Sequence, residues 1–317
     1  MLQLLQNEWM KTWKRTATHI MVVLLLLSVI AIAAITKYQE NGLSVPDNEN
    51  WRQGLEMENK DFQKQLDEGT VPPDSIEYMR TQIALNEYRL EHDISTNVDY
   101  SAWDFVSDSS ELISFAGLFT IIIAAGIVAN EFTWGTVKLL LIRPIGRAKI
   151  LLSKYFSILL FGICLILILF GFALLLGAIL FGFPESSIPY LNYHNGTVTE
   201  QSMLLHLLIT YGLNSINLLM ITTMAFMISS VFRNSSLAVG ISIFLMFMGS
   251  TVTYMLSTKF EWAKYILFAN TDLTQYLEGA PLVKGMTLTF SIVMLCVYFL
   301  IFHLLAFLVF KKRDVAA

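Results

Sequence analysis

Six long stretches of the chain contain no Asp, Glu, Lys or Arg. An α-helix needs about 20 apolar residues to cross a hydrocarbon core of about 30 Å. A membrane β-barrel would instead show short segments that alternate apolar and polar residues, and the nearly continuous apolar run over 20–35 does not fit that pattern. The sequence therefore predicts an all-α integral membrane protein whose six transmembrane helices cover 16–36, 112–130, 155–184, 201–232, 234–258 and 285–310.

The segment 37–111 is too long for an ordinary connection, so it is expected to carry structure of its own. Trp51 and Leu55 begin one run of apolar residues at helical spacing, and Ile76 and Met79 begin a second. Because Pro72-Pro73 separates the runs, the pattern predicts an external helical hairpin whose narrow apolar stripe packs on the membrane helices or on a partner. An acidic, solvated spacer is the alternative.

Composition and charge add an orientation. Apolar residues make up 55% of the chain and charged residues 15%, well below the soluble average of about 25%. Lys and Arg concentrate on one side of the predicted membrane, where the net charge is +9, while the other side carries −13. By the positive-inside rule we expect a multi-pass protein of the cytoplasmic membrane with both termini in the cytoplasm. The cytoplasmic segments are then 1–15, 131–154 and 311–317, and the external ones are 37–111, the loop 185–200 and 259–284.

Several kinds of chemistry have no counterpart in the sequence. It contains no Gly-x-x-x-x-Gly-Lys-Ser/Thr loop for phosphates, no His-Glu-x-x-His and no Gly-x-Ser-x-Gly. The five histidines show no metal-ligand spacing, and the excess of acidic residues disfavours nucleic acid as a partner. The spans also lack the Asp, Glu, Lys or Arg by which ion gradients are usually tapped. We therefore expect a chain that is not an enzyme and holds no metal or cofactor of its own.

The N-terminal segment 1–15 is predicted to form an amphipathic helix on the cytoplasmic surface of the bilayer. Its apolar face consists of Leu2, Leu5, Trp9 and Trp13, which places the tryptophans at headgroup depth. Membrane anchoring and partner docking are both open as its role.

The loop 131–154 carries the most specific pattern in the chain. A glutamate follows the second span, then a Gly-Thr pair, an apolar stretch, a turn of Pro, small residue and Arg, and a Lys that enters the next helix. This arrangement, together with the six spans, resembles the permeases of the type-2 ABC exporter family. In that family the loop is a coupling helix that docks on a separate ATPase subunit. The resemblance assigns this role to Glu131, Phe132, Gly135, Thr136, Pro144, Arg147 and Lys154.

The residues of this loop support a corner by themselves. Pro144 disfavours helix continuation at Arg143, and Gly146 permits unusual dihedral angles. Arg143, Arg147 and Lys149 are then suited to acids on an ATPase surface, with anionic lipid as the alternative partner.

The segment 259–284 also resembles the family, in which short helices before the last span dip back into the outer leaflet. We expect Asp272 to cap a helix that runs through Leu277. The residues of interest in this re-entrant segment are Asn270, Asp272 and Tyr276.

A candidate substrate pathway lies in the fourth span. Thr210, Asn214 and Asn217 share one helical face, with Tyr211 beside it. Polar side chains in a span face the interior of the bundle, where they join helices or line a cavity, and both roles are open here.

These features together predict the permease subunit of a bacterial ABC exporter that moves a drug, peptide antibiotic or lipid-like molecule. The resemblance implies two ATPase subunits, which hold ATP and Mg, and a second permease that is identical or homologous. Two other classes of function stay open: a non-transporting sensor or immunity subunit that binds an external peptide or protein, and an ATP-independent channel.

The predicted topology can be tested by cysteine labelling. Cysteines introduced at Gly42 and Asn195 should react with an impermeant maleimide from outside the cell, and one at Gly146 only after permeabilisation. The segregation of charge is the reason for this expectation. Labelling of the Gly146 site in intact cells would contradict it.

Overall fold

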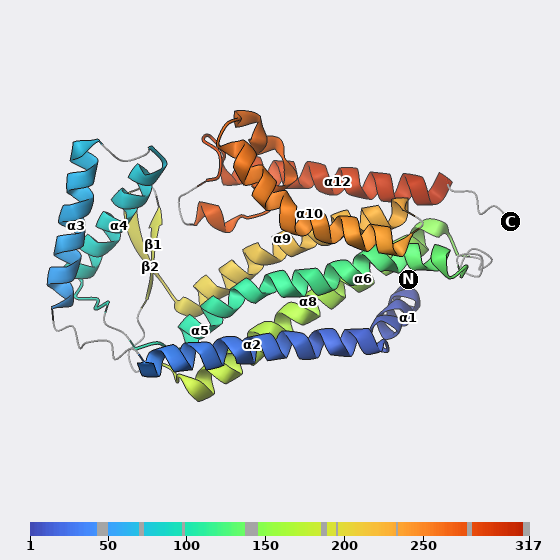
Figure 1. The fold of residues 1–317 in the computed structure, drawn as a ribbon, viewed down its shortest axis with the longest axis horizontal. Coiled ribbons are helices and arrows are strands. Elements are labelled where there is room, and N and C mark those ends of the chain that lie inside the picture. Colours follow the sequence, from blue (N-terminus) through green and yellow to red (C-terminus); the bar gives the residue numbers. More distant parts are fainter. Residues whose placement is uncertain are drawn as a thin grey trace.

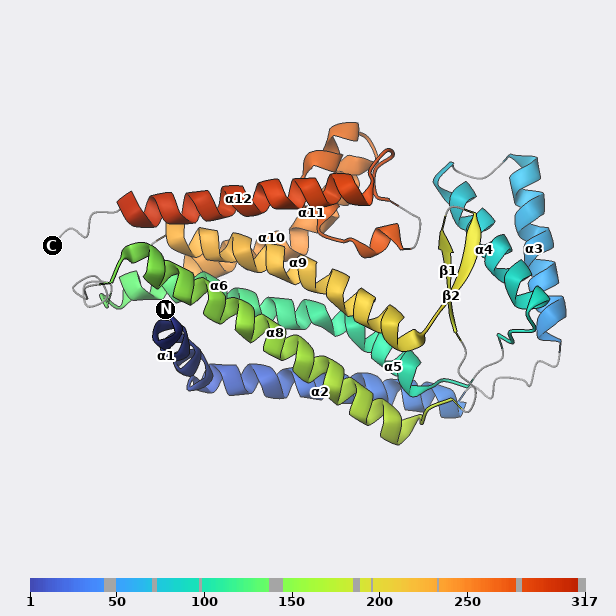
Figure 2. The same cartoon turned by 180° about the vertical axis from the view of Figure 1, so that it is seen from behind.

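Six long apolar helices run side by side along the molecule, as the computed structural model shows (Figures 1 and 2). The structure describes residues 1–42, 50–69, 73–96, 99–136, 145–184, 189–194, 196–232, 234–277 and 281–312. Each of the six is long and apolar enough to cross a membrane. The protein is therefore an all-α membrane protein. The helices are α2 (Thr16–Gly42), α5 and α6 joined by η1 (Ala102–Ser109, Ile113–Thr133 and Ser110–Leu112), α8 (Arg147–Leu180), α9 (Met203–Val231), α10 (Ser235–Ser257) and α12 (Leu288–Lys312).

Two of these helices begin well before the ranges predicted from charge-free stretches. The second begins at Ala102 rather than 112, and the third at Arg147 rather than 155. The Asp104 carboxylate accepts hydrogen bonds from the backbone N–H and hydroxyl of Ser101, at 2.9 and 2.6 Å, which caps the start of α5. Charged residues at the polar ends of a span do not stop the helix, so a search for uncharged stretches misses these turns.

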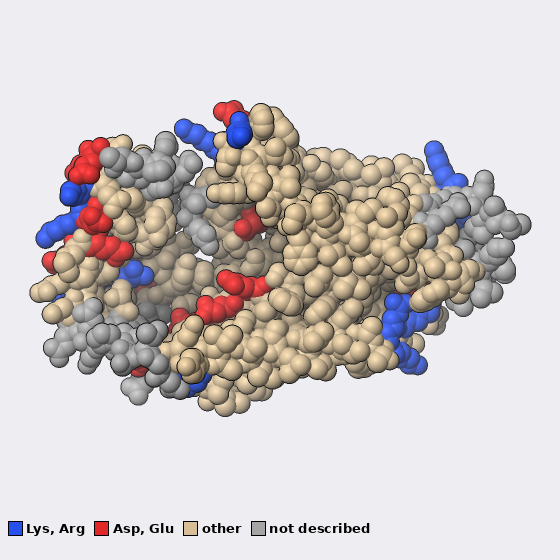
Figure 3. Space-filling view, viewed as in Figure 1, with Lys and Arg blue, Asp and Glu red and all other residues tan. Residues whose placement is uncertain are grey.

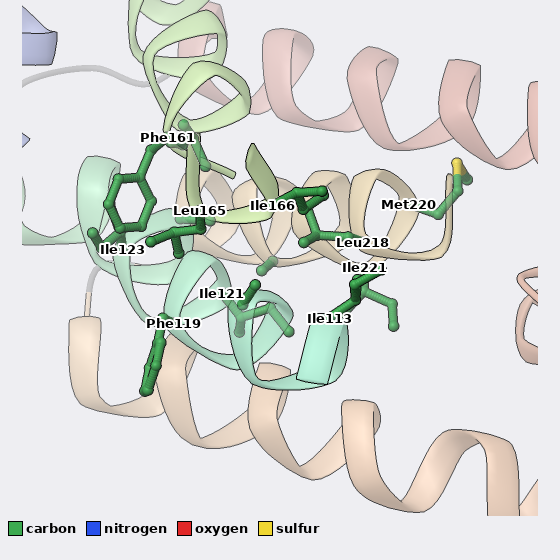
Figure 4. Packing of buried hydrophobic residues seen from close by; sticks show 14 of the residues in the cluster. Ile113, Phe119, Ile121, Ile123, Phe161, Leu165, Ile166, Leu218, Met220 and Ile221 are labelled. Carbon is green, nitrogen blue, oxygen red and sulfur yellow. The ribbon is translucent and has the colours of Figure 1, made fainter. Parts of the chain in front are cut away.

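Helix α6 is the centre of the bundle. Its span is 78% buried within the protein, whereas the other five are 17–33% buried over the same length of window. It packs against α8, α9 and α10, and Figure 4 shows Phe161 and Leu165 of α8 and Leu218 of α9 filling the same region as Ile121 of α6. The peripheral helices direct large apolar side chains outward, as expected for surfaces that meet lipid.

Polar side chains join these helices within the apolar core. The Ser229 hydroxyl of α9 accepts hydrogen bonds from the backbone N–H groups of Val128 and Ala129 in α6, at 3.2 and 3.1 Å. The hydroxyls of Tyr155 in α8 and Thr223 in α9 lie 2.8 Å apart. Such bonds contribute about 0.6 kcal/mol each in membrane bundles, so they chiefly set the register of the helices.

A separate structural unit covers one end of the bundle (left in Figure 1). It contains α3 (Trp51–Glu68), α4 (Pro73–Glu91) and an antiparallel ribbon of β1 (Tyr190–His194) and β2 (Thr197–Gln201). Within the described residues α4 packs on the ribbon, where the Tyr88 hydroxyl donates to the Glu200 carboxylate at 3.3 Å. The helical hairpin was expected on the membrane helices or a partner. The structure instead gives it a ribbon that the prediction had treated as a loop.

The opposite end carries both termini and α1 (Leu2–Trp13), which packs on α8 (Figure 1). Between α10 and α12 the chain forms three short helical turns, η2 (Glu261–Tyr265), α11 (Leu267–Asn270) and η3 (Thr274–Tyr276). On the face of the molecule drawn in Figure 3, charged side chains gather toward the two ends, and the surface of the bundle between them is uncharged. That distribution suits a protein whose middle lies in hydrocarbon.

The close approach of α5 and α8 makes a prediction at Gly177. A Cβ atom there would lie 3.1 Å from the Ala102 carbonyl oxygen, and that backbone atom has no freedom to move aside. We expect Gly177→Leu to destabilise the protein by about 1–3 kcal/mol through overpacking. Gly171→Leu is the matched control, since nothing lies within 4 Å of that Cβ position on the same helix. Thermal unfolding in detergent should show a lower midpoint for Gly177→Leu only; equal midpoints would contradict the packing.

Candidate functional site: a buried ion network and a polar cavity

A buried lysine joins three helices at the end that carries the termini. The Lys154 ammonium of α8 lies 2.9 Å from a carboxylate oxygen of Glu8 in α1 and 2.7 Å from one of Glu131 in α6. The Lys154 side chain is only 3% exposed. These three residues and their contacts are called the ion network below.

Two further contacts complete the ion network. The Lys11 ammonium donates to the second oxygen of Glu8 at 2.9 Å, and the Thr136 hydroxyl donates to the second oxygen of Glu131. Burial by itself raises the pKa of Glu8, but the ammonium groups of Lys154 and Lys11 outweigh it and hold that pKa below its ordinary value. Each carboxylate thus has a cation or donor on both oxygens, which is the condition for keeping charges in a buried site.

Local geometry at the end of α6 places these groups. Gly135 adopts a left-handed conformation with φ of +69°, which ends the helix and turns Thr136 back onto Glu131. On the far side of the loop, the Arg147 guanidinium at the start of α8 donates to the Lys311 carbonyl oxygen of α12 at 3.1 Å. Both flanks of the loop are therefore attached to the bundle.

The other residues of the predicted coupling loop fall into three groups: some pack in the core, some are exposed, and some lie outside the described residues. Phe132 packs against the main hydrophobic core. Pro144, with Arg143, lies outside the described residues. Lys149 is exposed on the first turn of α8, and Trp134 is exposed with the Arg15 guanidinium 5.9 Å from its ring centroid. Glu131 and Lys154, which the resemblance assigned to ATPase coupling, hold each other inside the protein.

Helix α1 turns its tryptophans toward the bundle. The rings of Trp9 and Trp13 lie 5.6 Å apart, and Trp13 meets Phe161 of α8 edge-on at 5.8 Å. Leu5 is half-buried and Leu2 is exposed. Trp13 thus contacts α8 and Trp9 packs against the main core, while their depth in the headgroup region stays a prediction.

Glu8 is the member of the ion network that sequence reasoning missed. A signal was available, because the predicted cytoplasmic side contains only three acidic residues, Glu8, Glu131 and Asp314. Two of these three are the carboxylates that bind Lys154. An isolated acid within a basic segment is a reasonable candidate for a buried partner.

A cavity of about 720 Å³ opens at the other end of the bundle. Its walls come from the end of α5, η1 and the first half of α6, the first two thirds of α9, the middle of α10, the segment around η3, and Tyr190 of β1. Thr210, Asn214 and Asn217 all line it, and the Thr210 hydroxyl oxygen and the Asn217 carbonyl oxygen are buried without a hydrogen-bond partner. Tyr211 faces away, since its hydroxyl donates to the Val106 carbonyl oxygen at 2.9 Å.

The re-entrant residues divide between this cavity and the packing of α12. Asp272 lines the cavity and accepts hydrogen bonds from the backbone N–H and hydroxyl of Thr274, at 3.0 and 2.6 Å. The helix expected to continue through Leu277 is the single turn η3, so that prediction was too long. The Ser291 hydroxyl of α12 lies 2.7 Å from the Asn270 side-chain oxygen and 2.6 Å from the Tyr276 hydroxyl, which fixes the segment to α12.

Neither site has the features of a metal centre. No group of three or more His, Cys, Asp or Glu side chains that could hold a metal ion occurs among the described residues. The two sites are thus a charge-compensated network of protein groups and an open cavity whose lining includes the polar residues Thr210, Asn214 and Asn217.

The fold defines a multi-pass membrane protein. Residues 77–316 match the model of a family described as a protein of unknown function (DUF2705), and the chain belongs to this family. It is 51% identical over 318 residues to the uncharacterized protein YhcI of Bacillus subtilis (strain 168), with both chains covered in full. It is also 34% identical over 224 residues to the uncharacterized membrane protein YdbK of the same organism, which covers 70% of this chain and 87% of that protein.

The ion network predicts a strong asymmetry between two lysines of α8. Lys154→Met would leave the Glu131 carboxylate without a cation and Glu8 with Lys11 alone, so we expect a loss of about 3–5 kcal/mol in unfolding free energy. Lys149→Met removes an exposed side chain and should change stability by about 0.5 kcal/mol or less. Unfolding in mixed micelles measures both.

A triple variant separates charge from packing. Adding Glu8→Gln and Glu131→Gln to Lys154→Met removes the unpaired charges and should recover part of the lost stability. If Lys154→Met were as stable as Lys149→Met, the ion network would have no energetic role.

Proposed function

We propose that this protein is the permease subunit of an ATP-driven exporter that moves a hydrophobic or amphipathic compound across the cytoplasmic membrane. A separate ATPase supplies the energy, and the complex contains two ATPase subunits and a second permease. The observation that carries the proposal is the ion network, because it attaches both ends of the loop between α6 and α8 to rigid helices.

A force that an ATPase applies to this loop would act directly on the helices of the bundle. Glu131 lies in the last turn of α6, Lys154 lies near the start of α8, and the ion pair of Lys154 with Glu8 adds α1. Helix α6 is the most buried span, and its other end contributes Ile113, Gly117 and Ile121 to the cavity. A displacement of the loop therefore moves a wall of the cavity, as a transporter driven by a docked motor requires.

The charge distribution supports an orientation of the chain in which the loop between α6 and α8 lies on the cytoplasmic side. The side expected to be cytoplasmic carries +9 and the other side −13. With the ion network in the cytoplasm, ATPase subunits have access to the loop, and the cavity opens toward the outside. ATP and Mg would be held by the partner, since the chain has no P-loop.

A sensor or immunity subunit is the second candidate. The unit formed by α3, α4 and the ribbon supports it, because Tyr190 of β1 lines the cavity and thereby joins this unit to the mouth. A peptide bound there could be sensed without being transported. ATP turnover that a compound stimulates, together with vesicle flux, distinguishes the exporter from the sensor.

The test is reconstitution with a candidate ABC ATPase subunit. The chain alone should show no ATP hydrolysis and no ATP-dependent flux in liposomes, and both should appear when the ATPase is added. Glu131→Ala and Arg147→Glu should reduce transport while membrane insertion persists. Uphill transport by the isolated chain under a proton gradient, or failure of the two proteins to co-purify, would refute the proposal.

Docking is tested separately at Lys149. This exposed residue lies outside the ion network, so Lys149→Glu should keep the fold and weaken ATPase binding by at least roughly tenfold through like-charge contact with an acidic surface. Lys60→Glu on α3, an exposed site at the other end of the molecule, is the matched control. Equal loss in both variants would rule out a docking role for Lys149.

A further inference from the structure

We propose that the cavity is a binding site for cationic amphipathic molecules; it opens beside the unit formed by α3, α4 and the ribbon, which is called the insert below. The inference rests on the proposed function and names the class of compound for its cavity. It combines three observations: the depth of the cavity, the sign of the charge at its mouth and the chemistry of its walls.

The cavity is large and deep enough to enclose an organic ligand. Its volume of about 720 Å³ lies within the roughly 300–1,000 Å³ that ligand pockets occupy. Along α9 its lining extends from His206 to Ile221, about 22 Å at 1.5 Å per residue. A ligand could therefore keep one end in water while the other reaches well into the bundle.

The mouth is acidic. Three carboxylates line the cavity, those of Asp108, Glu111 and Asp272, and no Lys or Arg is among its lining residues. All three residues are exposed, and none forms an ion pair within the described part of the chain. Figure 3 shows acidic side chains in the hollow between the insert and the bundle. Such a cluster attracts cations and repels anions.

The deeper wall is suited to the rest of an amphipathic molecule. The unpartnered oxygens of Thr210 and Asn217 are both hydrogen-bond acceptors, although the Thr210 hydroxyl can also donate. Both oxygens are buried, so a ligand that donates hydrogen bonds reaches them once these side chains turn into the cavity that their residues line. Below them Leu218 and Ile221 provide apolar surface, and Met246 adds an adaptable side chain.

These features set an order of preference. Carboxylates at the mouth and acceptor oxygens inside favour an ammonium-type or other organic cation with an apolar body. An anion of the same shape meets three like charges without a compensating base, so it should be excluded. Neutral apolar molecules can contact the apolar wall but gain no electrostatic attraction from the carboxylates at the mouth.

Two ions of nearly the same shape and opposite charge test the inference on the full chain without any ATPase. The protein is placed in phosphatidylcholine nanodiscs, and binding of radiolabelled tetraphenylphosphonium and of tetraphenylborate is measured by equilibrium dialysis, with empty nanodiscs subtracted. We expect saturable binding of the cation and none of the anion. Absence of cation binding, or equal binding of both ions, would overturn the inference.

Charge variants place the site. Glu111→Gln combined with Asp272→Asn should weaken cation binding by roughly tenfold, at up to about fivefold for each partly solvated charge pair. Asp61→Asn on the exposed face of α3 is the matched control and should bind as the unchanged protein does. Glu111→Lys should abolish cation binding while thermal unfolding stays the same. Unchanged affinity for the cation in the double variant would show that the cation binds elsewhere and would overturn the inference.

The outcome is independent of the permease proposal. Binding is measured on the chain alone, whereas the permease proposal depends on ATPase association and ATP-dependent flux. A chain that couples to an ATPase but ignores tetraphenylphosphonium would retain the permease assignment and lose the cationic site. A chain that binds the cation but associates with no ATPase would retain the cationic site and lose the permease assignment.

Discussion

Placing the Lys154 ammonium inside the protein is the constraint on which the organisation of one whole end depends. A buried cation is strongly unfavourable unless anions surround it, so the chain must bring Glu8 and Glu131 to the same point. That requirement fixes how α1 lies on α8 and where α6 stops. The turn through Gly135 and Thr136 then follows, because the threonine hydroxyl completes the coordination of Glu131.

Helix α6 connects this constraint to the opposite end. It is buried between α8, α9 and α10, and hydrogen bonds from its own backbone to Ser229 hold it against α9. One terminus enters the ion network and the other lines the cavity. Helix α6 therefore contributes to both sites, and no charged residue lies along it between Ile121 and Glu131.

The family comparison divides the chain in an informative way. The match over 77–316 contains Glu131, Lys154 and the cavity residues of α6, α9 and α10, but Glu8 precedes it. The relative that is 51% identical covers the chain in full, including α1. The helix that contributes Glu8 to the ion network thus lies outside the residues matched by the family model. This division makes α1 the natural place to look for differences in how members brace the loop.

Local pattern alone indicated the six spans, because an apolar stretch of about twenty residues without charges is long enough to cross a bilayer as a helix that satisfies its own backbone hydrogen bonds. The sequence also contains a signal for the ribbon, since an Asn-Gly pair such as Asn195-Gly196 between two strand-like segments is typical of a β-hairpin. Tertiary structure decided the rest. Glu8 and Lys154 are 146 residues apart, and their contact depends on how helices pack rather than on any neighbouring residue. Likewise Asn217 lines a cavity while Tyr211 does not, because packing chooses which face of α9 meets α5 and which stays open.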